Sequence, residues 1–339
     1  MTNTIPSKVE PEQDSGPSRR THTDRFRSVL AAREAGLAGV LVLVVIFLTW
    51  RSPYFLTTDN LIVVARQASL SLIIAVGMTF VILAGGIDLS VGSTVALVSI
   101  MTGEFMVNLQ LPMVLAAVLA LLCGVGVGLV NGLIVGMTSI PPFVVTLGML
   151  AVARGLALGI TQGQTISGFP DAFLVLGQGS LAGIPIPVWI AAVVAVVAHL
   201  VLARTRFGRN VFFVGSNEQA AVLSGIRVRR TKIAIFAIAG GLAGLEALIE
   251  TARLSVGQPS AGNGYELVAI GAVVIGGASL FGGEGSILGT VLGTCLLALI
   301  QDGLILLGIS AYWQQVFSGV IIVGAVALNI WRQKRSRGR

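Results

Sequence analysis

The chain has 339 residues, of which 55% are hydrophobic and only 11% are charged, and its mean hydropathy is +0.91. This composition excludes an ordinary soluble domain of the same length, which would carry far more charge. The net charge of +7 and the pI near 10.2 would suit a nucleic-acid-binding protein, but the basic residues gather in three polar segments. They are better explained as topology signals of a membrane protein.

Apolar runs separated by short polar stretches fill most of the chain after residue 34. In chain order they cover 35–50, 61–84, 88–107, 112–137, 142–161, 187–203, 233–252, 266–281, 286–308 and 313–331. They are too long, and alternate too little, for barrel strands, and lipid offers no water to unpaired backbone groups. The sequence therefore predicts an all-α fold, a polytopic transmembrane bundle of about ten helices.

The four tryptophans lie at the edges of apolar runs, at Trp50, Trp189, Trp313 and Trp331. Tryptophan gathers at the membrane–water interface because its ring is apolar while its indole N–H favours water. The run between Trp313 and Trp331 would span roughly 27 Å as a helix, close to the thickness of a bilayer core. This placement supports the membrane interpretation.

The polar start of the chain, residues 1–34, contains Pro6, Pro11 and Pro17 and scattered charge, and is expected to be a disordered cytoplasmic tail. It does not resemble a signal peptide, because the first apolar run begins late and lacks a small-residue cleavage pattern. Residues 35–331 are expected to form one membrane domain, followed by a basic cytoplasmic tail at 332–339.

Lysine and arginine total 22, and 18 of them lie in three segments: six before residue 35, seven between Arg204 and Lys232, and five after Trp331. An even number of predicted spans separates each segment from the next. Because basic residues favour the cytoplasmic side, both termini and the loop 204–232 are predicted to be cytoplasmic.

Sequence signatures of catalysis, metal binding and nucleotide binding are missing. Lys8, Lys232 and Lys334 follow Ser, Thr and Gln, so none completes the Gly-Lys-Ser/Thr of a phosphate-binding loop. Cys123 and Cys295 lie inside apolar runs, as small hydrophobic residues do. We therefore expect a non-enzyme with no metal and no cofactor of its own, so that any ATP would be hydrolysed by another polypeptide.

Acidic residues in or beside the spans are few: Asp88, Glu246, Glu250, Glu266 and Asp302. A charge at the bilayer centre costs roughly 2.5–3.5 kcal/mol on insertion scales, so each needs a partner or a water-filled cavity. Arg253 lies three residues after Glu250 on one helical face. This spacing favours an intrahelical ion pair over a transported-ion site.

Glycines recur every four residues in two spans, at Gly124, Gly128, Gly132 and Gly136, and at Gly285, Gly289 and Gly293. Such ladders let helix backbones approach closely in lipid, so we interpret them as packing. Each of the two ladders lies in a span that comes after a span with a Gly-Gly pair. This shared order suggests that the chain has two related halves, roughly 61–161 and 233–331. Transporters often contain such repeats, with the substrate route at their interface.

Two Gly-Gly segments interrupt the spans without a true loop. The first contains Gly85, Gly86, Asp88 and Ser90, and its Asp88 or Ser90 could cap the next helix; the second contains Gly276 and Gly277. One interpretation is a pair of broken helices that line a translocation pathway. The other is a pair of tight turns at the membrane face, and spacing alone does not separate the two.

Several motifs in order carry a resemblance to a known family: GMTFVILAGGIDLSVGS at 77–93, IPPFVVTLGM at 140–149, GNGYEL at 262–267 and GISAYWQQ at 308–315. Over about 36–331 the chain closely resembles the permease subunits of bacterial ABC monosaccharide importers of the ribose/xylose type. The resemblance implies that 35–331 is a permease domain in the bacterial inner (plasma) membrane that imports a monosaccharide or related polyol. It also implies two copies of this chain, in lipid, with a cytoplasmic ATPase that binds the ATP and a periplasmic sugar-binding protein.

The loop 204–232 carries a further part of the resemblance. TRFGR at 205–209 and GSNEQAAVLSGI at 215–226 look like the family's segment that docks on the ATPase, and the pattern is similar to the Glu-Ala-Ala-x-x-x-Gly loop of importer permeases, with Gln in place of Glu. The resemblance assigns coupling to Asn217, Glu218, Gln219, Ala220, Ala221 and Gly225. Ala220 and Ala221 are expected to sit in a groove of the ATPase.

Three departures from the family pattern keep the substrate open: Val268, Glu284 and Gln301-Asp302 stand where other residues are common. One alternative is an ABC permease for another small solute, a branched-chain amino acid or a signalling furanone. Another is an ion-coupled secondary transporter, whose uptake would collapse with the proton or sodium gradient. The residues that contact substrate, and whether the second permease copy is identical or a paralogue, also stay open.

Overall fold

The computed structural model of the chain describes residues 22–310 and, with gaps, 312–327, and it describes side chains from residue 34 on. The described pieces after 310 are 312–314, 316–317, 319–320, 323–324 and 327. Residues 1–21 of the predicted tail, the tail 332–339 and much of the predicted tenth span, 313–331, lie outside these residues.

The secondary structure of the described chain is almost entirely helical. The helices are α1 (His22–Arg51), α2 (Thr58–Leu83), α3 (Val91–Gly103), the π-helical η1 (Glu104–Asn108), α4 (Met113–Met137), α5 (Pro142–Thr161), α6 (Asp171–Gln178), α7 (Ile186–Arg204), α8 (Arg206–Ser216), α9 (Glu218–Leu223), α10 (Val228–Leu254), α11 (Tyr265–Ile275) and α12 (Ile287–Leu306). Four strands of two residues form two antiparallel pairs: β1 (Ile166–Ser167) with β4 (Val256–Gly257), and β2 (Ser180–Leu181) with β3 (Ile184–Pro185). The prediction of an all-α fold is confirmed.

Eight helical segments of the described chain are long and apolar enough to cross a membrane. They are Glu34–Arg51 of α1, Thr58–Leu83, Val91–Asn108, Met113–Met137, Pro142–Thr161, Ile186–Arg204, Val228–Leu254 and Ile287–Leu306. Each coincides with one of the predicted apolar runs, which confirms a multi-pass membrane protein. α1 begins at His22, within the predicted tail 1–34. Its residues after the last proline of the tail, Pro17, include several good helix formers, so the helix starts before the apolar run.

The predicted eighth span, 266–281, is only partly helical. α11 has eleven residues, Tyr265–Ile275, and at 1.5 Å per residue it is roughly 16 Å long, about half of a bilayer core. Gly276 and Gly277 end it, because Gly277 adopts a φ of +94°, which continues no right-handed helix. Hydropathy alone could not separate this half-length helix from the apolar turn that follows it.

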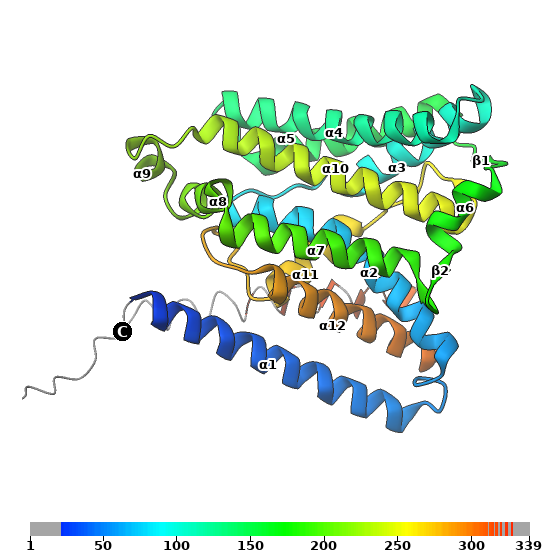
Figure 1. Cartoon of the computed structure of the whole chain (residues 1–339), viewed down its shortest axis with the longest axis horizontal. Helices are drawn as coiled ribbons and strands as arrows, with labels where there is room; N and C mark the ends of the chain where they lie inside the picture. Colours follow the sequence, from blue (N-terminus) through cyan, green and yellow to red (C-terminus); the bar gives the residue numbers. More distant parts are fainter. Residues whose placement is uncertain are drawn as a thin grey trace, which may run out of the picture.

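The long helices lie side by side, with α4 and α5 at one edge of the bundle and α1 at the other (Figure 1). α3, α10 and α12 are mostly buried, whereas few residues of α1, α4, α5 and α7 are buried. The start of α1 lies at the same end of the bundle as α8 and α9, here called the α9 end, and β1 and β2 lie at the opposite end, here called the β2 end (Figure 1). An even number of crossings therefore separates the start of α1 from α9, as predicted.

The glycine ladders pack helices together, as predicted. A Cβ added at Gly128 would overlap the carbonyl oxygen of Phe236, and one added at Gly124 would lie 2.7 Å from that of Gly240, so the first ladder lets α4 touch the backbone of α10. In the second half, a Cβ at Gly293 would overlap the carbonyl oxygen of Ala272. Backbones this close leave no room for larger residues.

Two non-helical segments, 84–90 and 255–264, enter the bundle before short helices. From the end of α10 the chain runs as an extended segment toward the middle of the bundle, where α11 begins (Figure 1). Gly262 of this segment meets Gly92 in the first turn of α3, since a Cβ on either glycine would overlap the carbonyl oxygen of the other. The beginnings of α3 and α11 therefore lie together inside the bundle.

Candidate functional site

The predicted coupling loop, 204–232, is folded into two short helices, α8 and α9. Each begins with a side-chain cap: Thr205 Oγ1 accepts a hydrogen bond from the backbone N–H of Gly208 (3.0 Å), and Asn217 Oδ1 accepts one from that of Ala220 (2.9 Å). Ser, Thr, Asn and Asp are favoured there because they pair the free N–H groups of a first turn. The loop is thus a built unit rather than an irregular connection.

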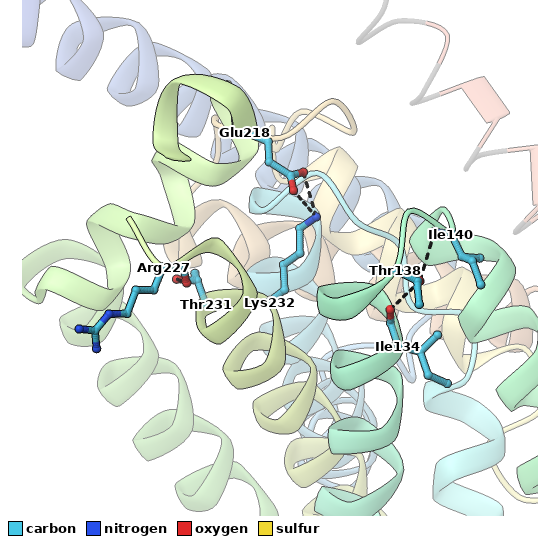
Figure 2. Close-up of polar contacts among 7 residues, drawn as sticks. All are labelled: Ile134, Thr138, Ile140, Glu218, Arg227, Thr231 and Lys232. Carbon is cyan, nitrogen blue, oxygen red and sulfur yellow. Dashed lines mark hydrogen bonds and ion pairs between the residues drawn. The ribbon is translucent and has the colours of Figure 1, made fainter. Parts of the chain in front are cut away.

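An ion pair ties α9 to the first turn of α10. Lys232 Nζ lies 2.7 Å and 2.8 Å from the two carboxylate oxygens of Glu218, and Figure 2 shows the pair bridging the two helices. Glu218 also lies in the first turn of α9, where a negative charge complements the helix dipole. Sequence reasoning placed Glu218 there but missed Lys232 as its partner.

Ala221 does not face outward, contrary to the expectation that it sits in a groove of the ATPase. It is 1% exposed and packs with Val214 of α8, Val228 of α10 and Ile226. A small residue is needed at this position because α9 lies close against its own neighbours. Of the two alanines in the pattern, Ala221 is therefore buried inside the folded loop and Ala220 is exposed on its surface.

The outer surface of α9 is apolar. Leu223 is 89% exposed and Val222 is 58% exposed, beside the exposed Gln219 and Ala220. Gly225 then turns the chain with a φ of +76°, a conformation that favours glycine. We call Gln219, Ala220, Val222 and Leu223 the α9 surface. Sequence reasoning missed its two large apolar residues, although an apolar pair in a basic polar loop was a visible signal.

Gly215, near the end of α8, sits on a junction of two turns. A Cβ there would overlap the carbonyl oxygen of Leu83, the last residue of α2, and would lie 2.8 Å from the backbone N of Gly283. The Gly283 N–H itself donates to the Leu83 carbonyl oxygen (2.9 Å), and Gly85 faces Gly215 at ordinary contact distance. The folded loop 204–232 therefore touches the end of α2 and the turn before α12 directly.

The two predicted Gly-Gly segments do not meet each other. Gly85 and Gly86 form the turn after α2. The glycine that packs beside Gly85 is Gly282, since a Cβ added at Gly282 would lie 2.9 Å from the backbone N of Gly85. Gly276 packs against Gly289 of α12 instead. Both segments end a helix, α2 and α11, but at separate places in the bundle, and their role in lining a translocation pathway stays a prediction.

Asp88 and Ser90 belong to a closed polar cluster with Asn131 of α4. Asp88 Oδ1 accepts from the backbone N–H (2.8 Å) and the hydroxyl (2.6 Å) of Ser90, and Asn131 Nδ2 donates to Ser90 Oγ (2.9 Å). Neither side chain caps α3, because both are used within the cluster. All three residues are at most 2% exposed, so the cluster lines no open route.

Two of the acidic residues within the spans, Glu250 and Asp302, have hydrogen-bond or ion-pair partners. Glu250 accepts a hydrogen bond from Tyr265 (2.7 Å) and lies 3.9 Å from Arg253, which confirms the predicted intrahelical pair. Asp302 Oδ2 accepts from Asn60 Nδ2 at 3.0 Å. The described side chains hold no group of three metal-ligating residues.

Comparison with known proteins gives consistent matches over most of the chain. The family described as "Branched-chain amino acid transport system / permease component" matches residues 60–326. The ribose import permease protein of Escherichia coli K12 is 42% identical over 91% of this chain and 97% of its own. The D-allose transport system permease protein of the same strain is 38% identical (85% and 88% coverage), and its xylose transport system permease protein is 32% identical (88% and 92%). No solved structure matches.

Proposed function

Because this chain belongs to the family of branched-chain amino acid transport system permease components, we propose that it is the membrane subunit of an ATP-driven importer for a monosaccharide. The observation that carries the sugar assignment is the 42% identity to a ribose import permease over 91% of the chain. The allose and xylose permeases among its relatives support the same class of solute. The protein acts in the plasma membrane as a multi-pass subunit.

Its partners follow from this proposal. ATP is hydrolysed by a separate cytoplasmic subunit, since none of the three lysines completes a phosphate-binding loop. A periplasmic binding protein delivers the sugar, and a second permease copy completes the membrane channel. The basic loop 204–232, which contains α8 and α9, faces the cytoplasm by the positive-inside rule, so the ATPase approaches the α9 end.

The geometry supports the α9 surface as the docking site for the ATPase. Val222 and Leu223 are large apolar side chains exposed on a polar loop, and they lie on a unit held rigid by two caps and an ion pair. A rigid unit of this kind passes on a movement of the ATPase because it does not deform. Movement of α9 would pass through Gly215 to the end of α2 and to the turn before α12, because their backbones are in contact there.

Leu223→Asp tests the docking site. Adding a charge to an apolar contact should abolish co-purification of the ATPase and lower ATP-driven uptake at least ten-fold, while the permease still reaches the membrane. Leu181→Asp is the matched control, because Leu181 is also exposed (64%) but lies in β2 at the opposite end. Equal loss of ATPase binding in both variants, or in neither, would refute the α9 surface as the docking site.

The importer itself is tested in liposomes that contain this chain, its ATPase and its binding protein. We expect uptake of D-ribose, D-allose or D-xylose that requires ATP and survives collapse of the proton and sodium gradients. The family description favours one second candidate, a branched-chain amino acid, and uptake of leucine instead of sugars would select it. Uptake that survives ATP depletion and collapses with an ion gradient would contradict both.

A further inference from the structure

A polar recess of about 440 Å³ opens beside α5, where α3 and α11 begin. Its polar lining consists of Ser93, Arg154, Ser260, Asn263 and Glu266, and its apolar lining of Leu150, Leu158 and Pro259. The volume lies within the ~300–1,000 Å³ typical of small-molecule sites. The recess is separate from the α9 surface, and it borders the closed Asp88 cluster, since Ser93 Oγ of its lining donates to the carbonyl oxygen of Ser90 (2.9 Å).

The recess lies at membrane depth. Arg154 is twelve residues after Pro142, the start of α5, and seven before Thr161, its end. At 1.5 Å per residue these separations are roughly 18 Å and 10 Å along the helix axis. Glu266 is in the first turn of α11, the half-length helix that begins in the middle of the bundle. A polar cavity at this depth requires a purpose, because ionisable groups in a bilayer are costly.

The backbone here is irregular, and irregular backbone at membrane depth is tolerated only where it is buried or lines a cavity. Arg154 Nη1 satisfies part of it, donating to the carbonyl oxygens of Pro259 (2.7 Å) and Ala261 (2.8 Å). Arg154 and Glu266 both line the recess, so its lining has one basic and one acidic side chain and no excess of either sign. Arg154 thus holds the segment 255–264 in place.

Two lining side chains have no such structural use. Ser260 and Asn263 are exposed to the recess, and neither makes a side-chain hydrogen bond within the described part of the chain. Their hydroxyl and amide can each donate and accept. Exposed polar groups at this depth need water or a solute as partner. The structural role of Arg154 does not explain why Ser260 and Asn263 line the recess.

We propose that this recess is the point at which the imported solute contacts the permease, and that the solute it takes is a neutral monosaccharide. This rests on the proposed function and adds the contact residues. Sugar hydroxyls both donate and accept, which matches Ser260 and Asn263, while the C–H faces of the ring pack on Leu150 and Leu158. Few hydrogen bonds and no unbalanced charge give weak binding, which a route of passage needs.

The test uses the complete importer in liposomes and D-ribose, D-allose and D-xylose as probes. Ser260→Leu and Asn263→Leu should fill the recess and lower sugar uptake at least ten-fold, while ATP hydrolysis stimulated by the binding protein stays within two-fold of the parent. Ser260→Ala, which removes one hydrogen-bonding group without filling space, should lower uptake about five-fold. Thr49→Leu, on the exposed face of α1, is the control and should change neither quantity.

Each outcome decides between the proposals. If the parent imports sugar and Ser260→Ala and Asn263→Leu import it as well, the recess is not the contact site, although the proposed function stands. If the parent imports leucine and no sugar, the proposed function fails and the monosaccharide assignment of the recess fails with it. If Asn263→Leu does not assemble with the ATPase, Ser260→Ala alone decides, because it adds no atoms.

Discussion

At the scale of single residues, Glu246 and Glu250 form a carboxyl pair one turn apart in α10. Glu246 is fully buried, and its two carboxyl oxygens have no hydrogen-bond partner in the described chain. An ionised carboxylate without a partner is costly in such a place. Glu250 has Tyr265 and Arg253 as partners, so we infer that Glu246, unlike Glu250, is neutral.

Glutamine substitutions at the two positions should therefore differ. Glu246→Gln replaces a neutral group by a neutral group of the same shape, and should leave the melting temperature of the purified permease unchanged or higher. Glu250→Gln removes the charge that balances the half-buried Arg253 and should lower the free energy of unfolding by about 1–3 kcal/mol. Thermal unfolding in detergent measures both, and equal losses would mean that Glu246 is ionised.

At the scale of helices, the contact between α4 and α10 depends on which glycine is changed. A Cβ at Gly128 would overlap the Phe236 carbonyl oxygen, whereas Gly126, two residues earlier on the other face of α4, has nothing within 4 Å. Gly128→Ala should force the helices apart and lower the melting temperature, and Gly128→Leu should reduce the yield of folded protein.

Gly126→Ala is the matched control on the same helix. Alanine favours a helix over glycine by about 1 kcal/mol, so this variant should be neutral or slightly stabilising. Thermal unfolding and size-exclusion elution of both variants test the contrast. A stable, well-folded Gly128→Leu protein with altered substrate preference would show that the ladder serves selectivity rather than packing.

At the scale of the whole molecule, orientation follows from the basic segments and from the position of α8. Ser216 of α8 lies at the α9 end and Ser180 of β2 at the opposite end (Figure 1), and both are exposed. In a background lacking Cys123 and Cys295, Ser216→Cys should resist an impermeant thiol reagent added to intact spheroplasts, while Ser180→Cys should react. The reverse pattern would overturn the cytoplasmic placement of the loop 204–232.

Sequence alone was sufficient for several properties that depend on local preference. The long apolar runs predicted the eight described spans, because transfer into lipid depends on composition within one segment. The four-residue glycine spacing predicted close helix packing, and clustered arginines predicted one loop that belongs on the cytoplasmic side. The Gln-Ala-Ala-x-x-x-Gly pattern predicted a turn at Gly225, which has the positive φ that such a turn requires.

Only the tertiary structure decided which distant residues meet and which way a side chain points. Ala221 faces inward and Leu223 outward because α9 packs on α8 and α10, which no local pattern encodes. Gly215 reaches Leu83, and Arg154 reaches two carbonyl groups of the segment before α11, across more than 100 residues of sequence. Hydropathy and periodicity report whether a residue prefers lipid, water or a helix, whereas contacts of this kind depend on how whole helices fit together.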